Sequence, residues 1–570
     1  VDRQRLADDR AHRHARVERR VRILEDDLHV AREPAQLEMF CLDSDGSVRG
    51  NMLFHALRVL LDLLGEEAQQ LDLDAVPEAG RTVVLKDTAN LSTGGTSVDV
   101  TDMVHPSIVF MAERISRVIG LDICGIDFIT KDISKPVSET RGAVIEVNAG
   151  PGFRMHLAPA EGLPRNVAAP VIDMLYPPGT PSRIPIVAVT GTNGKTTTTR
   201  LMAHLAKLMG YTVGYTTTDG IYIQNHLMMS GDCSGPGSAE FVLKDPTVNF
   251  AVLETARGGI LREGLGFDRC QVAVCTNIGA GDHLGMNFLH TPEDLVLVKR
   301  VIVQNVAPAG YAVLNAMDPL CAGMAAVCPG QVIYFALDRH HPLMATQRAQ
   351  GKRCIFVDGE HIVAAQGAWR ESILLRDIPL TRGGSIGFQV ENAMAAVAAA
   401  WGAGLDWDTI RRGVASFAND ADNAPGRFNV MDYRGATVIA DYGHNGDAMK
   451  ALVGAVAAMP ANKRVVVISG AGDRRDEDLR VQTEILGDAF DEAILYEDAC
   501  QRGREAGEVV ALLRAGLRGA KRTQHVEEIV GEFIAIDRAL SRLQPGDLCL
   551  VLVDQVEEAL AHLAKRIAEG

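Results

Sequence analysis

The sequence predicts a multidomain α/β protein, and three observations support this. The chain has 570 residues, which is too long for a single hydrophobic core. Short apolar runs such as "IPIVAVT", "NFAVLET" and "QVAVCTNIG" alternate with helical stretches, a pattern typical of a mainly parallel sheet covered by helices. The pattern returns in "ATVIADYG", "RVVVISG" and "LCLVLVD", which predict a second, Rossmann-like domain near the C-terminus.

Four segments follow in order along the chain. Residues 1–65 are atypical: the first forty are rich in Arg and Asp, contain no Lys and begin with Val, so we expect a disordered or non-native segment. Residues 66–178 hold the predicted strands "RTVVLK", "GLDICGIDFIT" and "GAVIEVN" and the helix "HPSIVFMAERISRVIG", which indicate an α+β module. The proline-rich stretch "YPPGTPSRIP" then leads into a central domain, 179–423, and a C-terminal domain, 424–570.

Composition excludes several classes of protein. There are 57 Lys and Arg against 73 Asp and Glu, and this net charge of −16 argues against a nucleic-acid partner. No apolar run reaches the roughly 18 to 20 residues of a membrane helix, and the N-terminus has no apolar signal core. The ten cysteines form no CxxC pair. We therefore expect a cytoplasmic protein that acts on small molecules, with no membrane partner.

The stretch "VAVTGTNGKTTTTR" predicts a phosphate-binding loop. A strand runs into "GTNGKT" and then a helix, so successive N–H groups and the helix N-terminus face one anion. Lys195 can reach the β- and γ-phosphates, and Thr196 offers a hydroxyl to Mg²⁺. The common pattern GxxxxGK[ST] needs Gly where this chain has Val189, so the loop, with Gly191 and Gly194, is a shortened variant.

Three residues beyond this loop are candidates to complete the site. Glu254 and His283 each follow an apolar strand, and ligands bind at the carboxyl ends of parallel strands. Either side chain could hold a metal, although a helix cap and a core histidine are the alternatives. Lys299 stands on an otherwise apolar helix, where a surface salt bridge is the alternative.

These motifs together resemble a known family. "TGTNGKTTTTR", "LETARGGILR", "ENAMAAVAAA", "DYGHN" and "GAGDRRDED" resemble the Mur ligase superfamily of ATP-dependent, amide-forming enzymes. Over about residues 66–570, "GIDFIT", "IEVNAGPGFRMHLAP" and "YTTTDGIYI" further resemble the cyanophycin synthetase family, in which an ATP-grasp module precedes a Mur-like ligase. The resemblance implies ATP and Mg²⁺ as cofactors and a homo-oligomer.

The resemblance also implies a reaction and a set of site residues. ATP would activate a β-carboxylate of a poly-aspartate primer as an acyl phosphate, which arginine then attacks. The implied nucleotide contacts are Gly191, Thr192, Asn193, Gly194, Lys195, Thr196, Thr197, Asn392, Arg427 and Asp441. The implied metal ligands here are Thr196, Glu254 and His283, and the implied catalytic residues are Lys195, Glu254, His283 and Lys299, the last as a carbamate.

The first module carries part of another ATP site. Asp127, Glu146 and Asn148 resemble the magnesium ligands of ATP-grasp enzymes, whose module would add aspartate to the backbone. Only about 65 dissimilar residues precede the match. We therefore expect an N-terminally truncated module and an incomplete aspartate-adding half. A peptidoglycan-precursor ligase of the same superfamily and a non-catalytic scaffold remain as alternatives.

Overall fold

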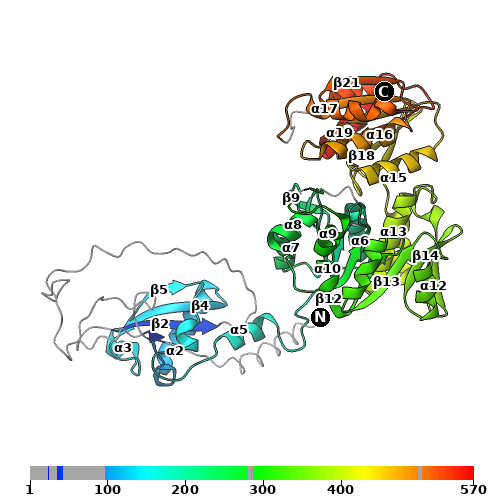
Figure 1. Cartoon of the computed structure of the whole chain (residues 1–570). Helices are drawn as coiled ribbons and strands as arrows, with labels where there is room; N and C mark the ends of the chain where they lie inside the picture. Colours follow the sequence, from blue (N-terminus) through cyan, green and yellow to red (C-terminus); the bar gives the residue numbers. More distant parts are fainter. Residues whose placement is uncertain are drawn as a thin grey trace. The chain divides into compact units, whose positions relative to one another are not determined.

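The computed structural model describes residues 97–279, 284–285, 287–497 and 503–569, together with the backbone of two short segments, β1 (Ile23–Leu24) and β2 (Ala35–Leu42). The chain divides into two compact units, Val1–Arg183 and Ile184–Gly570 (Figure 1). The predicted strand "RTVVLK" and most of the atypical segment 1–65 lie outside the described residues. Within that segment β2 pairs with β4.

The first unit contains a three-stranded antiparallel sheet in the order β2-β4-β5. β4 (Ile123–Thr130) and β5 (Ala143–Asn148) are two of the predicted strands, and α2 (Pro106–Ile119) is the predicted helix. α2 buries Ile108 and Ala112 in a small core with Ile126 and Phe128 of β4. Shorter elements complete the unit: β3 (Ser97–Val98), α3 (Val137–Thr140), α4 (Arg154–Leu157) and α5 (Ala168–Leu175).

The second unit begins with an eleven-stranded sheet, and its central strands are parallel. In spatial order these are β14 (Cys354–Asp358), β13 (Gln331–Ala336), β12 (Val306–Asn315), β11 (Cys270–Cys275), β6 (Ile186–Thr190), β10 (Phe250–Glu254) and β7 (Val213–Thr216). Antiparallel strands close both edges: β8 (Gly220–Ile223) and β9 (His226–Ser230) on one side, β15 (His361–Gln366) and β16 (Trp369–Leu374) on the other. The predicted doubly wound sheet is confirmed.

Helices cover both faces of this sheet (Figure 1). α6 (Lys195–Leu208), α13 (Gly387–Gly402) and α14 (Trp407–Ser416) pack on one face. The other face carries α7 (Pro236–Lys244), α8 (Arg257–Glu263), α9 (Pro292–Lys299), α10 (Val301–Gln304), α11 (Pro319–Gly323) and α12 (Pro342–Ala349). Val187 and Val189 of β6 point to the first core, and Ile186 and Ala188 point to the second. Because both faces are buried, the strand is apolar throughout.

The C-terminal domain repeats this architecture with six strands in the order β17-β18-β22-β19-β20-β21. These are β17 (Asn429–Tyr433), β18 (Ala436–Asp441), β22 (Leu548–Leu552), β19 (Arg464–Ile468), β20 (Glu492–Glu497) and β21 (His525–Val530), all parallel except β17. α15 (Gly446–Ala457), α16 (Asp476–Gly487) and α17 (Glu508–Gly516) cover one face, and α18 (Glu532–Leu540) and α19 (Val556–Glu569) the other. The second predicted α/β domain is thus present.

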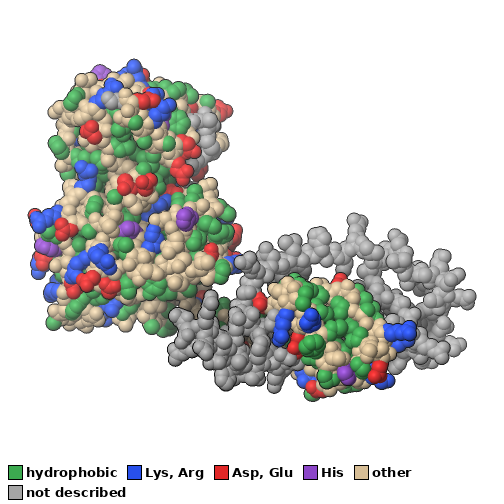
Figure 2. Space-filling view, turned by 180° about the vertical axis from the view of Figure 1, so that it is seen from behind, with side chains coloured by type: hydrophobic (Ala, Val, Ile, Leu, Met, Phe, Trp, Pro, Cys, Tyr) green, Lys and Arg blue, Asp and Glu red, His purple; other side chains and the backbone are tan. Residues whose placement is uncertain are grey.

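Strand order determines where a ligand can bind. From β6 the chain moves to β7 and β10 on one side and then crosses to β11 on the other. Such a reversal opens a crevice at the carboxyl ends of the strands. On the face seen in Figure 2, acidic and basic side chains are interspersed. None of the helices in the described part of the chain is both long and apolar enough to cross a membrane.

Candidate nucleotide site

The loop between β6 and α6 packs so tightly that glycine is required at two positions. Gly191 has a φ of 145° and Gly194 a φ of 87°, both favourable only for glycine. A Cβ on Gly191 would collide with the Thr276 hydroxyl, and one on Gly194 with the side-chain oxygen of Asn392. The end of β11 and helix α13 therefore press directly against the loop.

Hydrogen bonds from the residues after β11 hold this loop in shape. The Thr192 N–H donates to the Asn277 carbonyl at 2.9 Å, and the Asn193 N–H donates to the Asn277 side chain at 2.9 Å. The Thr276 hydroxyl donates to the Asn193 carbonyl at 2.6 Å. The loop is thus preorganised, and the first N–H groups of α6 follow it directly, as an anion-binding helix N-terminus requires.

The two predicted lysines converge on one carbonyl oxygen. The ammonium of Lys195 donates to the carbonyls of Gly191 at 3.2 Å and Thr192 at 3.0 Å. Lys299, at the end of α9, donates to the same Gly191 carbonyl at 2.9 Å. Its side chain is completely buried, so the surface salt-bridge interpretation of Lys299 is wrong. Both amines support the phosphate loop, Lys299 from within the protein and Lys195 from the wall of a cavity.

Glu254, at the end of β10, lies beside Thr196 at the start of α6. The Thr196 hydroxyl donates to Glu254 Oε2 at 2.9 Å, and the Thr218 N–H donates to the same oxygen at 3.3 Å. Burial raises the pKa of Glu254, and the charge of Lys195 and the bond from Thr196 partly offset this. Glu254 Oε1 is buried and finds no hydrogen-bond donor among the described residues. Such an oxygen calls for a cation or a further donor.

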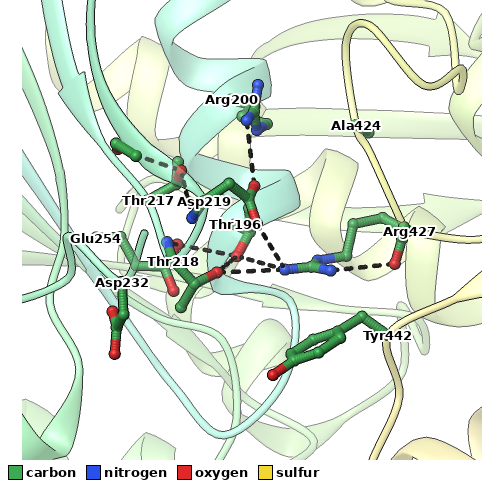
Figure 3. Close-up of polar contacts among 12 residues, drawn as sticks. Thr196, Arg200, Thr217, Thr218, Asp219, Asp232, Glu254, Ala424, Arg427 and Tyr442 are labelled. Atoms are coloured by element: carbon green, nitrogen blue, oxygen red, sulfur yellow. Dashed lines mark hydrogen bonds and ion pairs between the residues drawn. The ribbon is translucent and has the colours of Figure 1, made fainter. Parts of the chain in front are cut away.

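Arg427 brings the C-terminal domain to the same point (Figure 3). One of its nitrogens lies 3.3 Å from the hydroxyl of Thr196 and 3.3 Å from that of Thr218. It also lies 3.7 Å from a carboxylate oxygen of Asp219, and the guanidinium stacks 5.2 Å from the Tyr442 ring centre. Residues more than 200 positions apart therefore form one polar cluster.

A pocket of about 170 Å³ opens from this cluster. Most of the predicted nucleotide contacts line it: Thr192, Asn193, Gly194, Lys195, Thr196, Thr197, Asn392, Arg427 and Asp441. Phe335, Phe388 and Leu452 add apolar walls that suit an aromatic base. Burial raises the pKa of Asp441 to about 6, with Arg427 acting in the opposite direction.

A second, larger cavity of about 880 Å³ adjoins the first, and Thr192, Lys195 and Thr218 line both. Its walls come from both domains of the second unit and include Arg257, Arg262, Lys299, Tyr442, His444 and Arg474. Acidic side chains line it as well, namely Asp232, Glu263, Asp473 and Asp554. Among the described residues, no three His, Cys, Asp or Glu side chains gather as for a metal cluster. The predicted ligand His283 lies outside the described residues.

The three candidates in the first unit also lie together. Asp127 on β4 is the register partner of Glu146 on β5, and the Asn148 amide donates to Glu146 at 3.2 Å. The pKa of Asp127 is raised to about 6, mainly by burial and to a lesser extent by the interaction with Glu146. Two carboxylates this close repel each other unless a proton or a cation is shared between them.

Sequence reasoning missed several residues of the site. Thr218 and Asp219 lie within the motif "YTTTDGIYI", whose sequence indicates no role for them, yet both contact Arg427. Asn277 shapes the phosphate loop, and Asn445 exchanges hydrogen bonds with Asn193 at 2.9 and 3.3 Å. A polar residue just past a predicted parallel strand is the signal that could have found Asn277, which is the second residue after β11.

Fold and loop together define a P-loop α/β protein with an appended Rossmann-like domain. Comparison with known proteins agrees: residues 189–400 match the Mur ligase middle domain, and residues 426–552 match the Mur ligase, glutamate ligase domain. The UDP-N-acetylmuramyl-tripeptide synthetase of Deinococcus radiodurans is 30% identical, over 68% of this chain and 77% of that protein. The chain belongs to the Mur ligase family, whose members are ATP-dependent ligases.

A narrower similarity extends over most of the chain. The cyanophycin synthetase of Synechocystis sp. is 46% identical over 505 residues, which are 88% of this chain and 57% of that protein. This chain thus spans little more than half the length of the cyanophycin synthetases it matches. A solved structure of E. coli FolC in complex with DHPP and ADP superposes with a TM-score of 0.50 and 21% identity, covering 68% of this chain and 89% of that one, and so shares the fold.

Proposed function

We propose that this chain is an ATP-dependent amide ligase that joins arginine to the β-carboxylates of a poly-aspartate chain. The similarity to cyanophycin synthetases supports the choice of substrates. The structural observation that carries the proposal is the convergence of Lys195, Thr196 and Glu254 with Arg427 of the other domain. This arrangement suits phosphoryl transfer, which depends on positioning and charge neutralisation more than on covalent catalysis.

The proposed reaction has two steps, and residues of this chain support each of them. A carboxylate is a poor electrophile, so it first takes the γ-phosphoryl group of ATP and becomes an acyl phosphate, with ADP as the other product. The amine of arginine then attacks the carbonyl carbon, phosphate leaves and the amine loses a proton. The loop from Gly191 to Thr197 would hold the phosphates of ATP. Lys195 and Arg427 would offset the negative charge on the phosphoryl group as it passes from ATP to the carboxylate.

Magnesium fits the residues present. Glu254 Oε1 is buried without a donor among the described residues, and the Thr196 hydroxyl lies 2.9 Å from the other oxygen. Oxygen donors of this kind suit a hard divalent cation, so Thr196 and Glu254 would hold it, with His283 as a third proposed ligand. Bound there, the ion would neutralise charge on the transferred phosphoryl group. We also propose Lys299 as a supporting residue, either as an amine or as a carbamate.

The larger cavity is the proposed site of the acceptor chain. It opens directly beside Lys195, and Arg257, Arg262 and Arg474 in its walls are the proposed partners of the poly-aspartate carboxylates. The walls also carry acidic residues, so these contacts would depend on individual arginines and not on a uniformly positive cavity. Because both domains contribute its walls, it would shield the acyl phosphate from hydrolysis by bulk water. From the resemblance alone, we further propose that the protein acts in the cytoplasm as a homo-oligomer on an acidic polypeptide primer.

One experiment tests this function. Purified protein is incubated with Mg-ATP, β-unsubstituted poly-aspartate and labelled arginine, and both polymer-bound label and nucleotide products are measured. We expect one ADP and one phosphate per arginine joined. Release of AMP and pyrophosphate would contradict the acyl-phosphate route. A parallel incubation with labelled aspartate tests the first unit, and one with a UDP-muramyl peptide tests the peptidoglycan alternative.

A further inference from the structure

An acidic residue outside the predicted site connects the two domains. Asp219 lies between β7 and β8, and its two carboxylate oxygens face different arginines (Figure 3). Oδ2 accepts a hydrogen bond from Arg200 at 3.1 Å, and Oδ1 lies 3.7 Å from Arg427. Asp219 is thus the carboxylate that links a fixed arginine of the central domain to the arginine supplied by the C-terminal domain.

Arg200 provides the rigid end of this arrangement. It lies on α6 one helical turn after Thr196, and its side chain is only 6% exposed. It also donates to the Tyr222 hydroxyl at 2.9 Å and stacks 4.8 Å from that ring, which in turn stacks on Tyr215. Because Arg200 is packed in this way, Asp219 cannot easily follow Arg427 if the C-terminal domain moves.

Arg427, by contrast, occupies a position shared with the proposed metal. Its nitrogen donates to the Thr196 hydroxyl, which itself donates to Glu254. A guanidinium and a divalent cation repel each other, so both cannot use this hydroxyl at once. Without Thr196, this nitrogen keeps the neutral Thr218 hydroxyl as an acceptor, and the carboxylate of Asp219 offers a charged one. The 3.7 Å gap to Asp219 exceeds a hydrogen bond by only about 1 Å.

We propose that Asp219 is a positioning residue for Arg427: it holds the guanidinium at the phosphate loop and takes it over from Thr196 when magnesium and ATP bind. This inference rests on the proposed function, because it takes Thr196 and Glu254 as the magnesium site. Asp219 itself lines neither of the two cavities. Its effect on catalysis passes through Arg427, whose place relative to the γ-phosphate it determines.

Binding of a non-hydrolysable ATP analogue, measured by calorimetry over a range of Mg²⁺ concentrations, tests this role without turnover. We expect Asp219→Asn to weaken binding of the Mg²⁺ complex about tenfold and to raise the Mg²⁺ concentration needed for half-saturation. Asp219→Glu keeps the charge, so its binding should stay within about threefold of the wild type. Because Asp219 acts through Arg427, Asp219→Asn should add little to the loss caused by Arg427→Gln.

A matched control removes a different half-buried carboxylate. Glu492 begins β20 and pairs with Lys463 at 2.7 Å. It therefore lies at the amino ends of the parallel strands, whereas Asp441 lies at their carboxyl ends. Glu492→Gln should leave analogue binding unchanged. Binding of the analogue by Asp219→Asn within twofold of the wild type would overturn the inference. So would a double variant, Asp219→Asn with Arg427→Gln, whose loss of affinity equals the product of the two single losses. Failure of arginine ligation with intact analogue binding would instead reject the proposed function.

Discussion

The buried ammonium of Lys299 donates a hydrogen bond to the carbonyl of Gly191 at 2.9 Å. A lysine on α9 thereby supports a loop that precedes it by more than 100 residues. Gly191 is also the residue whose φ of 145° allows the loop to lie against Thr276. The lysine and the glycine therefore act together to set the shape of the phosphate loop.

Lys299→Met should lower arginine ligation by roughly ten- to a hundredfold, because the buried Gly191 carbonyl loses a donor. Steady-state assays at saturating Mg-ATP measure this. Lys299→Ala, assayed with and without a small carboxylic acid, distinguishes the two proposed roles. Recovery with the acid would favour the carbamate, and loss without recovery would favour the ammonium contact. Wild-type activity in both variants would contradict each of them.

Lys195→Ala should reduce the rate on the order of a hundredfold or more, since it removes a positive charge beside the transferred phosphoryl group. The release of ADP and the incorporation of arginine should fall together. Lys244→Ala is the control, because that lysine is exposed on α7 of the same domain and pairs with Glu240 at 2.8 Å. A fully active Lys195→Ala protein would mean that ATP binds elsewhere.

Glu254→Gln should raise the Mg²⁺ concentration for half-maximal activity about tenfold or more, because an amide oxygen binds a hard cation more weakly than a carboxylate. A magnesium titration at fixed ATP measures this. The exposed Glu240→Gln variant controls for loss of a negative charge. An unchanged magnesium requirement would show that Glu254 serves only as a partner of the Thr196 hydroxyl.

Asp441 predicts a pH dependence of stability. Its pKa in the folded protein is about 6, above the ordinary value of 3.8, so the folded state binds a proton more readily than the unfolded state. The resulting stability is present at low pH and is lost as pH rises through about 6. Between pH 5 and pH 8, the free energy of unfolding of the wild type should fall by about 1 kcal/mol more than that of Asp441→Asn. Urea unfolding at the two pH values measures this. An equal pH dependence in both proteins would contradict this.

Asp127→Ala should leave arginine ligation within about twofold of wild type. The phosphate loop, Glu254 and Arg427 all belong to the second unit, whereas Asp127 belongs to the first. The same variant should abolish any aspartate incorporation that the wild-type chain shows, because it removes a proposed metal ligand. Loss of arginine ligation in this variant would indicate that the first unit takes part in that reaction as well.

The sequence by itself determined the local structure and the position of the phosphate loop. Apolar runs and the helical stretch after the first of them predicted β6, α6, β10 and the parallel sheet, because burial on both faces demands continuous apolar runs. Glycine spacing and the lysine that follows predicted the loop between β6 and α6. These signals are local, so a single sequence is enough to identify them.

Only the tertiary structure decided which distant side chains meet. The apolar neighbours of Lys299 in the sequence left its role open, but packing of α9 against the sheet brings its amine to Gly191. The sequence offers no sign that Asp219 lies between Arg200 and Arg427, because that arrangement depends on strand order and on the placement of the C-terminal domain. Ionic contacts form across space between residues that no periodicity relates, and the fold alone brings them together.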